Sequence, residues 1–226
     1  MAAAEFLRSI RSNPRIGLVT VPGQIPGPRA PEHDQRVWKT IEVWDYLRWR
    51  GLVAKIILIS GLPDRNGLTG ARYMRGQFET FGRTRGLDLE PYLEIGEEES
   101  AHTGPSIRLL RPHVFKKDGD GRIIPQYDAI GLVTNTPHLR VAGVYAKHLL
   151  RPIPIFKISS GDGRGAAAGD ALNVAYLKYR IRESLHWMGA WSVDWVWKGT
   201  FLDLFDYSNK LRAICCTREW PPIVVV

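Results

Sequence analysis

The sequence predicts an α/β fold: a Rossmann-like three-layer sandwich built on a mainly parallel sheet, with an aromatic-rich C-terminal extension. Three observations lead to this prediction. Short apolar runs bounded by Gly and Pro recur along the chain, as expected for strands buried on both faces. Longer segments with helical periodicity lie between these runs. The two patterns alternate at least four times, which is typical of a parallel sheet with helices on both sides.

The first half of the chain contains two strand–helix pairs. A strand is expected over residues 15–21, and a helix over 34–50 that an aspartate caps at its first position. Four positions of this helix fall at helical spacing: Val37, Ile41, Trp44, and either Leu47 or Arg48. A second strand is expected over 54–61, followed by a helix over 69–83 with a threonine as its cap.

The second half continues the alternation. A short strand is expected over 93–95, and longer strands over 128–134 and 154–159. Helices are expected over 138–150 and 166–187. Right-handed crossovers would bring the carboxyl ends of all parallel strands to one edge of the sheet.

The expected domain organisation has three parts. Residues 1–14 form an N-terminal segment, residues 15–187 the Rossmann-like domain, and residues 188–226 the aromatic-rich extension. The extension is interpreted as a packing element on the same domain. An oligomer interface, and a lid over a ring-shaped substrate, are the alternatives.

Composition places the chain among globular proteins. It has 226 residues, of which 44% are hydrophobic and 24% charged. No window approaches the roughly 18 apolar residues of a membrane span, and the first residues do not resemble a signal peptide. The two adjacent cysteines, Cys215 and Cys216, are expected to be a buried pair in a reducing compartment. A cytoplasmic location is therefore expected.

The formal charge of +8 is compatible with nucleic acid, a phosphate-bearing ligand, an anionic membrane surface or a basic solvated exterior. The arginines are dispersed and form no basic tail. Among these partners a small anionic ligand is expected, and nucleic acid is the least expected. A homo-oligomer is also compatible with the sequence.

Polar residues follow the second expected strand. The hydroxyl of Ser60 and the exposed backbone of Gly61, beside a helix start, are suited to holding a phosphate or carboxylate. The alternative is a glycine that serves only the turn.

The stretch 97–103 combines carboxylates, hydroxyls and an imidazole. Glu97 and His102 are candidate catalytic residues or ligands of a divalent metal, and Ser100 and Thr103 are candidate ligand-binding residues. The alternative is a solvated acidic run before a helix that Ser100 caps.

A third polar group spans a strand end and a helix start. Thr134 and Asn135 are suited to orienting a ligand, His138 to exchanging a proton, and Arg140 to clamping a phosphate or carboxylate. The alternative is that Asn135 or Thr136 only caps the helix while His138 faces solvent.

The fifth strand is followed by Gly161-Asp162-Gly163-Arg164-Gly165. This is a candidate phosphate-binding loop through Gly161 and Gly163, although its spacing departs from the dinucleotide fingerprint and a flexible connector is the alternative. No Gly-x-Ser-x-Gly, His-Glu-x-x-His or Walker-type pattern is present, which disfavours a hydrolase-fold esterase, a zinc protease and a P-loop NTPase.

Several of these stretches resemble the YdcF-like family, the domain of unknown function that includes the SanA and ElyC envelope proteins. The resemblance rests on a Gly-containing loop after the first strand, with Gly23, and on an early helix arginine, Arg36. It also rests on three longer stretches: RWRGLVAKIILISG, GEEESAHTG and GLVTNTPHLRVA. It covers residues 15–158 but departs at His102, where the family has Asn, at Gly70, where it has an acidic residue, and in the spacing of the final His and Arg.

The resemblance implies a Rossmann-like sheet with a pocket at its rim and, for one branch of the family, S-adenosylmethionine binding. With the motifs above it predicts a hydrolase or transferase that acts on a small phosphate- or nucleotide-containing substrate at the carboxyl ends of the strands. The alternative is a non-catalytic binding module for an adenosine-containing ligand such as S-adenosylmethionine. Redox chemistry is disfavoured because no clear dinucleotide fingerprint is present.

Overall fold

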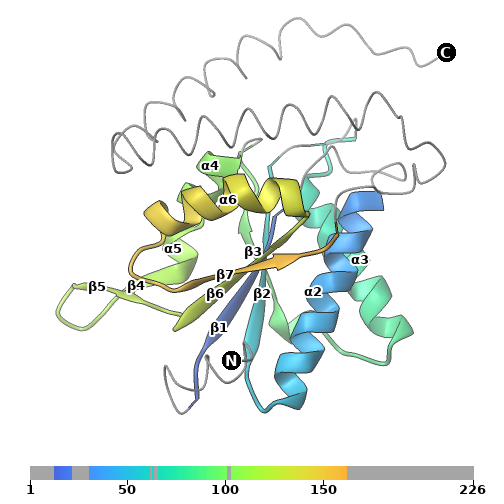
Figure 1. The fold of residues 1–226 in the computed structure, drawn as a ribbon, viewed down its shortest axis with the longest axis horizontal. Coiled ribbons are helices and arrows are strands. Elements are labelled where there is room, and N and C mark those ends of the chain that lie inside the picture. Colours follow the sequence, from blue (N-terminus) through green and yellow to red (C-terminus); the bar gives the residue numbers. More distant parts are fainter. Residues whose placement is uncertain (1–12, 22–30, 62, 64–65, 101–102, 162–226) are drawn as a thin grey trace, which may run out of the picture.

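The computed structural model of the chain describes residues 13–21, 31–61, 63, 66–100 and 103–161. Within them lies a five-stranded sheet in the order β3-β2-β1-β6-β7, and every neighbouring pair is parallel. Helices cover both faces of this sheet (Figure 1), which confirms the predicted α/β sandwich. The expected helix over 166–187, the aromatic extension and the cysteine pair lie outside the described residues.

Five strands build the sheet, and their bounds match the expected apolar runs closely: β1 Ile16–Thr20, β2 Ala54–Ile59, β3 Leu93–Glu97, β6 Ala129–Thr134 and β7 Ile155–Ser159. The strand ends lie level with one another. Thr20 pairs with Leu58 on one side and with Val133 on the other. The order reverses between β1 and β6, which makes this junction the topological switch point where ligands bind in open α/β sheets.

The helices form the outer layers. One face of the sheet carries α2 (Pro31–Trp49) and α3 (Gly70–Thr84), and the other carries α4 (Thr103–Leu109), α5 (Arg111–Val114) and α6 (Thr136–Leu149) (Figure 1). A 3-10 turn, η1 (Glu90–Tyr92), leads into β3. Among the described residues, no helix is both long and apolar enough to cross a bilayer.

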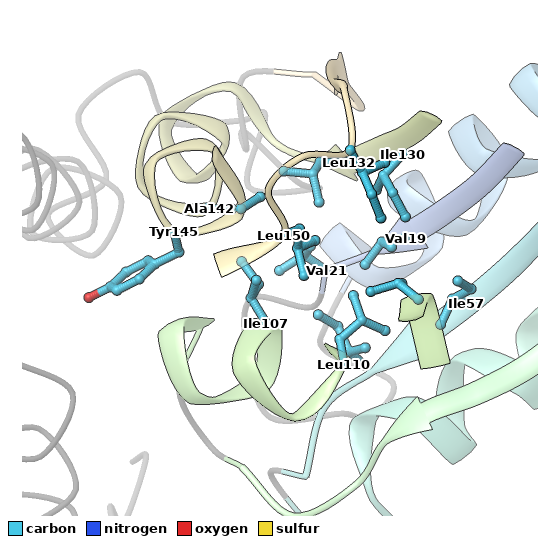
Figure 2. Packing of buried hydrophobic residues seen from close by; sticks show 14 of the residues in the cluster. Val19, Val21, Ile57, Ile107, Leu110, Ile130, Leu132, Ala142, Tyr145 and Leu150 are labelled. Carbon is cyan, nitrogen blue, oxygen red and sulfur yellow. The ribbon is translucent and has the colours of Figure 1, made fainter. Parts of the chain in front are cut away.

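Alternating strand residues supply two separate cores. Leu18, Ile56 and Leu58 face α2 and α3, and they pack with Ile41 and Phe78 from those helices. The opposite residues of the same strands face α4 and α6. Figure 2 shows that core, which includes Val19, Ile57, Leu110, Leu132 and Ala142. Because both faces of each central strand are buried, the strands read as continuous apolar runs.

Two helix starts differ from the prediction. The helix expected from Asp34 begins earlier, at Pro31, because proline is well suited to the first helical position, where its missing N–H leaves no bond unmade. Asp34 therefore lies in the first turn and is not the cap. The helix expected from His138 begins at Thr136, because Asn135 caps it and a proline again fits the first turn.

The stretch between the third and fourth sheet strands forms elements of its own. After α5, the antiparallel hairpin of β4 (Phe115–Lys117) and β5 (Ile123–Pro125) closes on a turn in which Asp118 accepts hydrogen bonds from the backbone N–H groups of Asp120 and Arg122. Its base joins the core through Phe115.

Candidate functional site

The buried polar side chains gather at one edge of the sheet. All five strands end at this carboxyl edge, and the helices α2, α3, α4 and α6, which follow β1, β2, β3 and β6 in the described residues, begin beside it. Ten polar or charged residues are buried in the described part of the chain, and all lie at strand ends or in helix turns beside this edge: Thr20, His33, Arg36, Thr40, Ser60, Glu97, Ser106, Thr134, Asn135 and His138. We call them the carboxyl-edge cluster. Because burying polar groups costs free energy, their concentration in one place marks a candidate site.

The end of β1 is tied to α2 by buried hydrogen bonds. The hydroxyl oxygens of Thr20 and Thr40 lie 3.0 Å apart, and Thr40 Oγ1 donates to the Arg36 carbonyl at 2.8 Å. Arg36 Nη1 donates to the Val21 carbonyl at 2.9 Å. The fully buried guanidinium therefore places a positive charge beside the switch point, with one of its N–H groups used by the backbone.

His33 belongs to the cluster although no sequence signal marked it. Its ring is 0% exposed, packs edge-on against Tyr73 with centroids 5.7 Å apart, and has no hydrogen-bond partner for either nitrogen among the described residues. Burial, together with the positive charge of Arg36, lowers the pKa of His33 to about 3. His33 is therefore a neutral imidazole at neutral pH.

Two titratable neighbours of His33 are also perturbed. Burial raises the pKa of Asp34, whose Oδ1 is buried without a hydrogen-bond partner among the described residues. Burial and then the charge of Asp34 raise the pKa of Tyr73. The first turns of α2 and α3 therefore form a poorly solvated environment in which charge is disfavoured.

Glu97 organises the loop that follows β3. Its Oε1 accepts hydrogen bonds from the backbone N–H groups of Glu99 and Ser100. Its Oε2 is buried and has no partner within the described chain. The Ser60 N–H donates to the Glu97 carbonyl at 3.0 Å, which joins the ends of β2 and β3. The loop is thus held by one oxygen of a carboxylate that is only 5% exposed.

Gly61 allows this loop to pass close to the end of β2. Its N–H donates to the Ser100 carbonyl at 2.8 Å. A Cβ at Gly61 would lie 2.4 Å from backbone atoms of Glu98, Glu99 and Ser100, so a larger residue does not fit without movement of the backbone. The close approach of the loop is a packing reason for a glycine at position 61. An anion-binding role for Ser60 and Gly61 stays a prediction.

Glu98 faces α3 and links the loop to that helix. It accepts hydrogen bonds from Thr69 Oγ1 at 2.5 Å and from Arg72 Nε at 2.8 Å. Burial acts to raise the pKa of Glu98, but the hydrogen bonds from Thr69 and Arg72 and the charge of Arg72 outweigh it and lower the pKa. Glu98 is therefore an ionised structural residue.

His138 lies between two hydroxyl groups from different parts of the chain. Its Nε2 is 2.6 Å from Thr103 Oγ1, at the start of α4, and its Nδ1 is 3.4 Å from Thr134 Oγ1, at the end of β6. The His138 side chain is buried, so it does not face solvent as the alternative interpretation of the sequence held. The structure thus brings together three of the predicted site residues.

Asn135 caps α6, as one interpretation of the sequence held. Its Oδ1 accepts a hydrogen bond from the His138 N–H at 3.1 Å. We expect Asn135→Ala to lower the free energy of unfolding by about 1 kcal/mol, and Asn135→Ser to lower it much less, because serine is also a good cap. Urea denaturation of the two variants checks this, and equal losses would contradict the capping role.

The end of β7 closes the other side of the α6 start. The Thr136 N–H donates to the Gly161 carbonyl at 2.8 Å, and the hydroxyls of Thr136 and Ser159 lie 2.7 Å apart. Gly161 has a φ of 129°, a conformation that strongly favours glycine. The described contacts of Gly161 are therefore those of a turn, and its predicted phosphate-binding role stays a prediction.

The described contacts do not connect the remaining predicted residues to His138 in a single site. Strands β3 and β6 are three interstrand spacings apart, roughly 14 Å, and no hydrogen bond links Glu97 to His138 within the described chain. Arg140 is exposed on α6. Gly23, His102 and Gly163 lie outside the described residues.

A divalent metal was among the expected cofactors. The described residues contain no group of three or more His, Cys, Asp or Glu side chains arranged to hold a metal ion. Binding of a divalent metal stays a prediction, and so does binding of S-adenosylmethionine.

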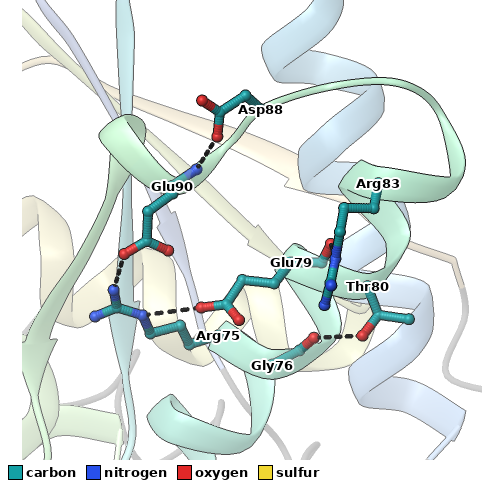
Figure 3. Close-up of polar contacts among 7 residues, drawn as sticks. All are labelled: Arg75, Gly76, Glu79, Thr80, Arg83, Asp88 and Glu90. Carbon is teal, nitrogen blue, oxygen red and sulfur yellow. Dashed lines mark hydrogen bonds and ion pairs between the residues drawn. The ribbon is translucent and has the colours of Figure 1, made fainter.

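A cavity of about 500 Å³ lies at the opposite edge of the sheet. Its lining comes from the end of α3 and the turn before β3: Glu79, Arg83, Gly86, Leu87, Asp88, Leu89 and Glu90. Figure 3 shows that its carboxylates are already engaged, since Arg75 bridges Glu79 and Glu90. Asp88 accepts a hydrogen bond from the Glu90 N–H. The cavity contains no member of the carboxyl-edge cluster, so we do not assign the site to it.

Comparison with known proteins leaves the family open. No family model, no curated protein and no solved structure matches this chain. The resemblance to the YdcF-like family therefore stays a prediction that rests on the quoted motifs, and the carboxyl-edge cluster is the feature from which a function has to be argued.

Proposed function

We propose that this protein is an enzyme that acts on a small phosphate- or nucleotide-containing substrate by hydrolysis or group transfer at the carboxyl edge of the sheet. The observation that carries the proposal is the His138 imidazole, buried at the edge with a hydroxyl within hydrogen-bond distance of each ring nitrogen. An imidazole held in this way is suited to general acid–base catalysis, because histidine is the side chain most often used for that chemistry and the orientation of this ring is set in advance.

Charge and topology support an anionic substrate. The chain carries a formal charge of +8, which raises the local concentration of anions. The buried Arg36 lies beside the switch point between β1 and β6, where doubly wound sheets bind phosphate-bearing ligands. Hydrolysis and group transfer both require proton transfer to or from an oxygen, which is the chemistry that His138 can supply.

Two experiments test the proposal, first a measurement of ligand binding and then a measurement of turnover. A thermal-shift panel of nucleotides, phosphate monoesters, S-adenosylmethionine and divalent metals identifies which compounds stabilise the fold. Release of phosphate or of the transferred group from the stabilising compounds is then measured. For His138→Gln we expect binding to remain and turnover to fall by about 10²- to 10⁴-fold.

The outcomes separate the two functions considered. Turnover that depends on His138 supports the enzyme. Stabilisation by an adenosine-containing ligand without any turnover supports the binding module instead. Absence of stabilisation by every phosphate-containing compound would overturn the proposed substrate class.

A further inference from the structure

We infer that Thr103 is the nucleophile of this site, with His138 as its base and Thr134 as the group that orients the imidazole. The inference rests on the proposed function for the identity of the substrate. The activation of the Thr103 hydroxyl follows from the geometry alone.

The three side chains have the arrangement that an activated hydroxyl requires. A threonine hydroxyl is a weak nucleophile until a neighbouring base removes its proton, and the base works best when a third group orients it. Thr103 Oγ1 lies 2.6 Å from His138 Nε2, and Thr134 Oγ1 lies 3.4 Å from Nδ1. With the imidazole proton on Nδ1, directed at Thr134, the lone pair of Nε2 accepts the hydrogen bond from Thr103.

Burial decreases along this line from the interior to the surface. Thr134 is 0% exposed, His138 is 7% exposed, and Thr103 is only partly buried. The orienting group is therefore the most enclosed of the three, and Thr103 at the outer end is the least buried. This order is expected when the base and the group that orients it lie deeper in the protein than the nucleophile.

Three threonines that lie further inside helices use their hydroxyls differently. Thr40, Thr80 and Thr84 each donate to a backbone carbonyl of their own helix, at 2.8 Å in each case. Thr136, which like Thr103 is the first residue of its helix, contacts Ser159 and Gly161 at the end of β7. The Thr103 hydroxyl is instead directed at an imidazole from a helix that begins 33 residues later in the chain, as α4 packs against α6.

Glu97 acts here as a positioning residue. Its Oε1 binds the N–H groups of Glu99 and Ser100, and the Ser100 carbonyl accepts the Gly61 N–H. The chain is thereby fixed three residues before Thr103. This explains how Glu97 can matter to the site without contacting His138.

The chemistry balances with these groups and water. Thr103 Oγ1 forms a bond to the substrate phosphorus as its proton passes to Nε2 of His138. The bond from phosphorus to the leaving oxygen breaks, and that oxygen takes the proton from Nε2. Water then attacks phosphorus while giving a proton to Nε2, the bond to Thr103 breaks, and the proton returns to the threonine oxygen. An acceptor alcohol in place of water makes the same sequence a group transfer.

The test uses an alkyl fluorophosphonate, which phosphonylates activated hydroxyls with loss of fluoride and does not require the natural substrate. The full-length protein is labelled, digested and mapped by mass spectrometry. We expect an adduct on Thr103 and none on Thr80, which serves as the control in the same molecule. We expect Thr103→Ser to be labelled, Thr103→Val not to be labelled, and His138→Gln to be labelled about 10²- to 10⁴-fold more slowly.

Each result of the labelling experiment supports or overturns the role of Thr103 as nucleophile. Labelling of Thr103 that depends on His138 supports the inference, even if no phosphate-containing compound is turned over, in which case only the proposed substrate class falls. Absence of an adduct on Thr103 in the unaltered protein, or an equal rate in His138→Gln, overturns it. Turnover that persists in Thr103→Val would leave the proposed function standing and remove Thr103 from it.

Discussion

Replacing His33 with leucine is expected to stabilise the protein, and by more as the pH falls. The imidazole is fully buried and neither ring nitrogen has a hydrogen-bond partner among the described residues. Burying an unsatisfied polar group costs about 1–3 kcal/mol, so we expect His33→Leu to gain about 1–2 kcal/mol near pH 7.5, where the ring is neutral.

The additional gain at lower pH follows from proton linkage. The pKa of His33 is about 3 in the folded protein against 6.5 for the ordinary side chain. Between these values the unfolded chain binds the proton and the folded chain does not, so acid favours unfolding. The contribution of the neutral His33 to the free energy of unfolding is fully present above pH 6.5. Below pH 6.5 this contribution falls by about 1.4 kcal/mol for each pH unit. The unaltered protein should lose about 2 kcal/mol through His33 between pH 7.5 and pH 5, and His33→Leu should not.

Urea denaturation at pH 7.5, 6 and 5 measures this difference. His113→Leu is the matched control, because the His113 ring is partly exposed and lies 2.8 Å from a carboxylate oxygen of Glu94. Its removal should give no gain that grows with acidity. A gain from His33→Leu that is the same at pH 7.5 and pH 5 would contradict a buried neutral imidazole.

Replacing Gly61 with alanine is expected to destabilise the protein by about 2–3 kcal/mol. The added Cβ would lie 2.4 Å from backbone atoms of Glu98, Glu99 and Ser100, and backbone cannot move aside as a flexible side chain does. The loop has to shift as a unit. Because it leads to Thr103, we also expect the variant to lose fluorophosphonate labelling at that residue.

Gly76→Ala is the matched control for this substitution. Gly76 is an exposed glycine within α3, and a Cβ added there would have no atom of a neighbouring residue within 4 Å. Alanine there should raise the free energy of unfolding by roughly 0.5–1 kcal/mol, because glycine is a poor helix former. Equal and small effects at Gly61 and Gly76 in urea denaturation would show that the loop is not tightly packed against the end of β2.

Much of the fold follows from local patterns. The buried hydrophobic residues of α2 are those expected from helical spacing, Val37, Ile41, Trp44 and Leu47. Thr69 caps α3 as expected, accepting from the Arg72 N–H at 3.3 Å. These features depend on residues that are neighbours in sequence, so periodicity and capping chemistry reveal them. The predicted start of α2 at Asp34 is wrong, because both a proline and an aspartate are typical of helix starts and the helix begins at the proline, Pro31.

The candidate site was only partly predictable. Polar residues at strand ends and helix starts stand out in an apolar pattern, and for that reason the sequence offers His138, Thr134, Glu97 and Thr103 as candidates. The structure adds a contact that the sequence does not predict, because Glu97 Oε1 binds the backbone N–H groups of Glu99 and Ser100 in the loop before Thr103. The expected catalytic or metal-binding role of Glu97 stays a prediction. The pairing of Thr103 with His138 depends on how α4 packs against α6, which no local pattern encodes.

By itself, the sequence determined the class of fold and the edge at which polar residues collect, because burial periodicity and the direction of parallel strands are properties of short segments. Only the tertiary structure decided which of those residues touch, and which of them, such as His33, lose all access to water. Hydrogen bonds and desolvation are set by distances of a few ångströms between elements far apart in the chain, and helix packing fixes those distances.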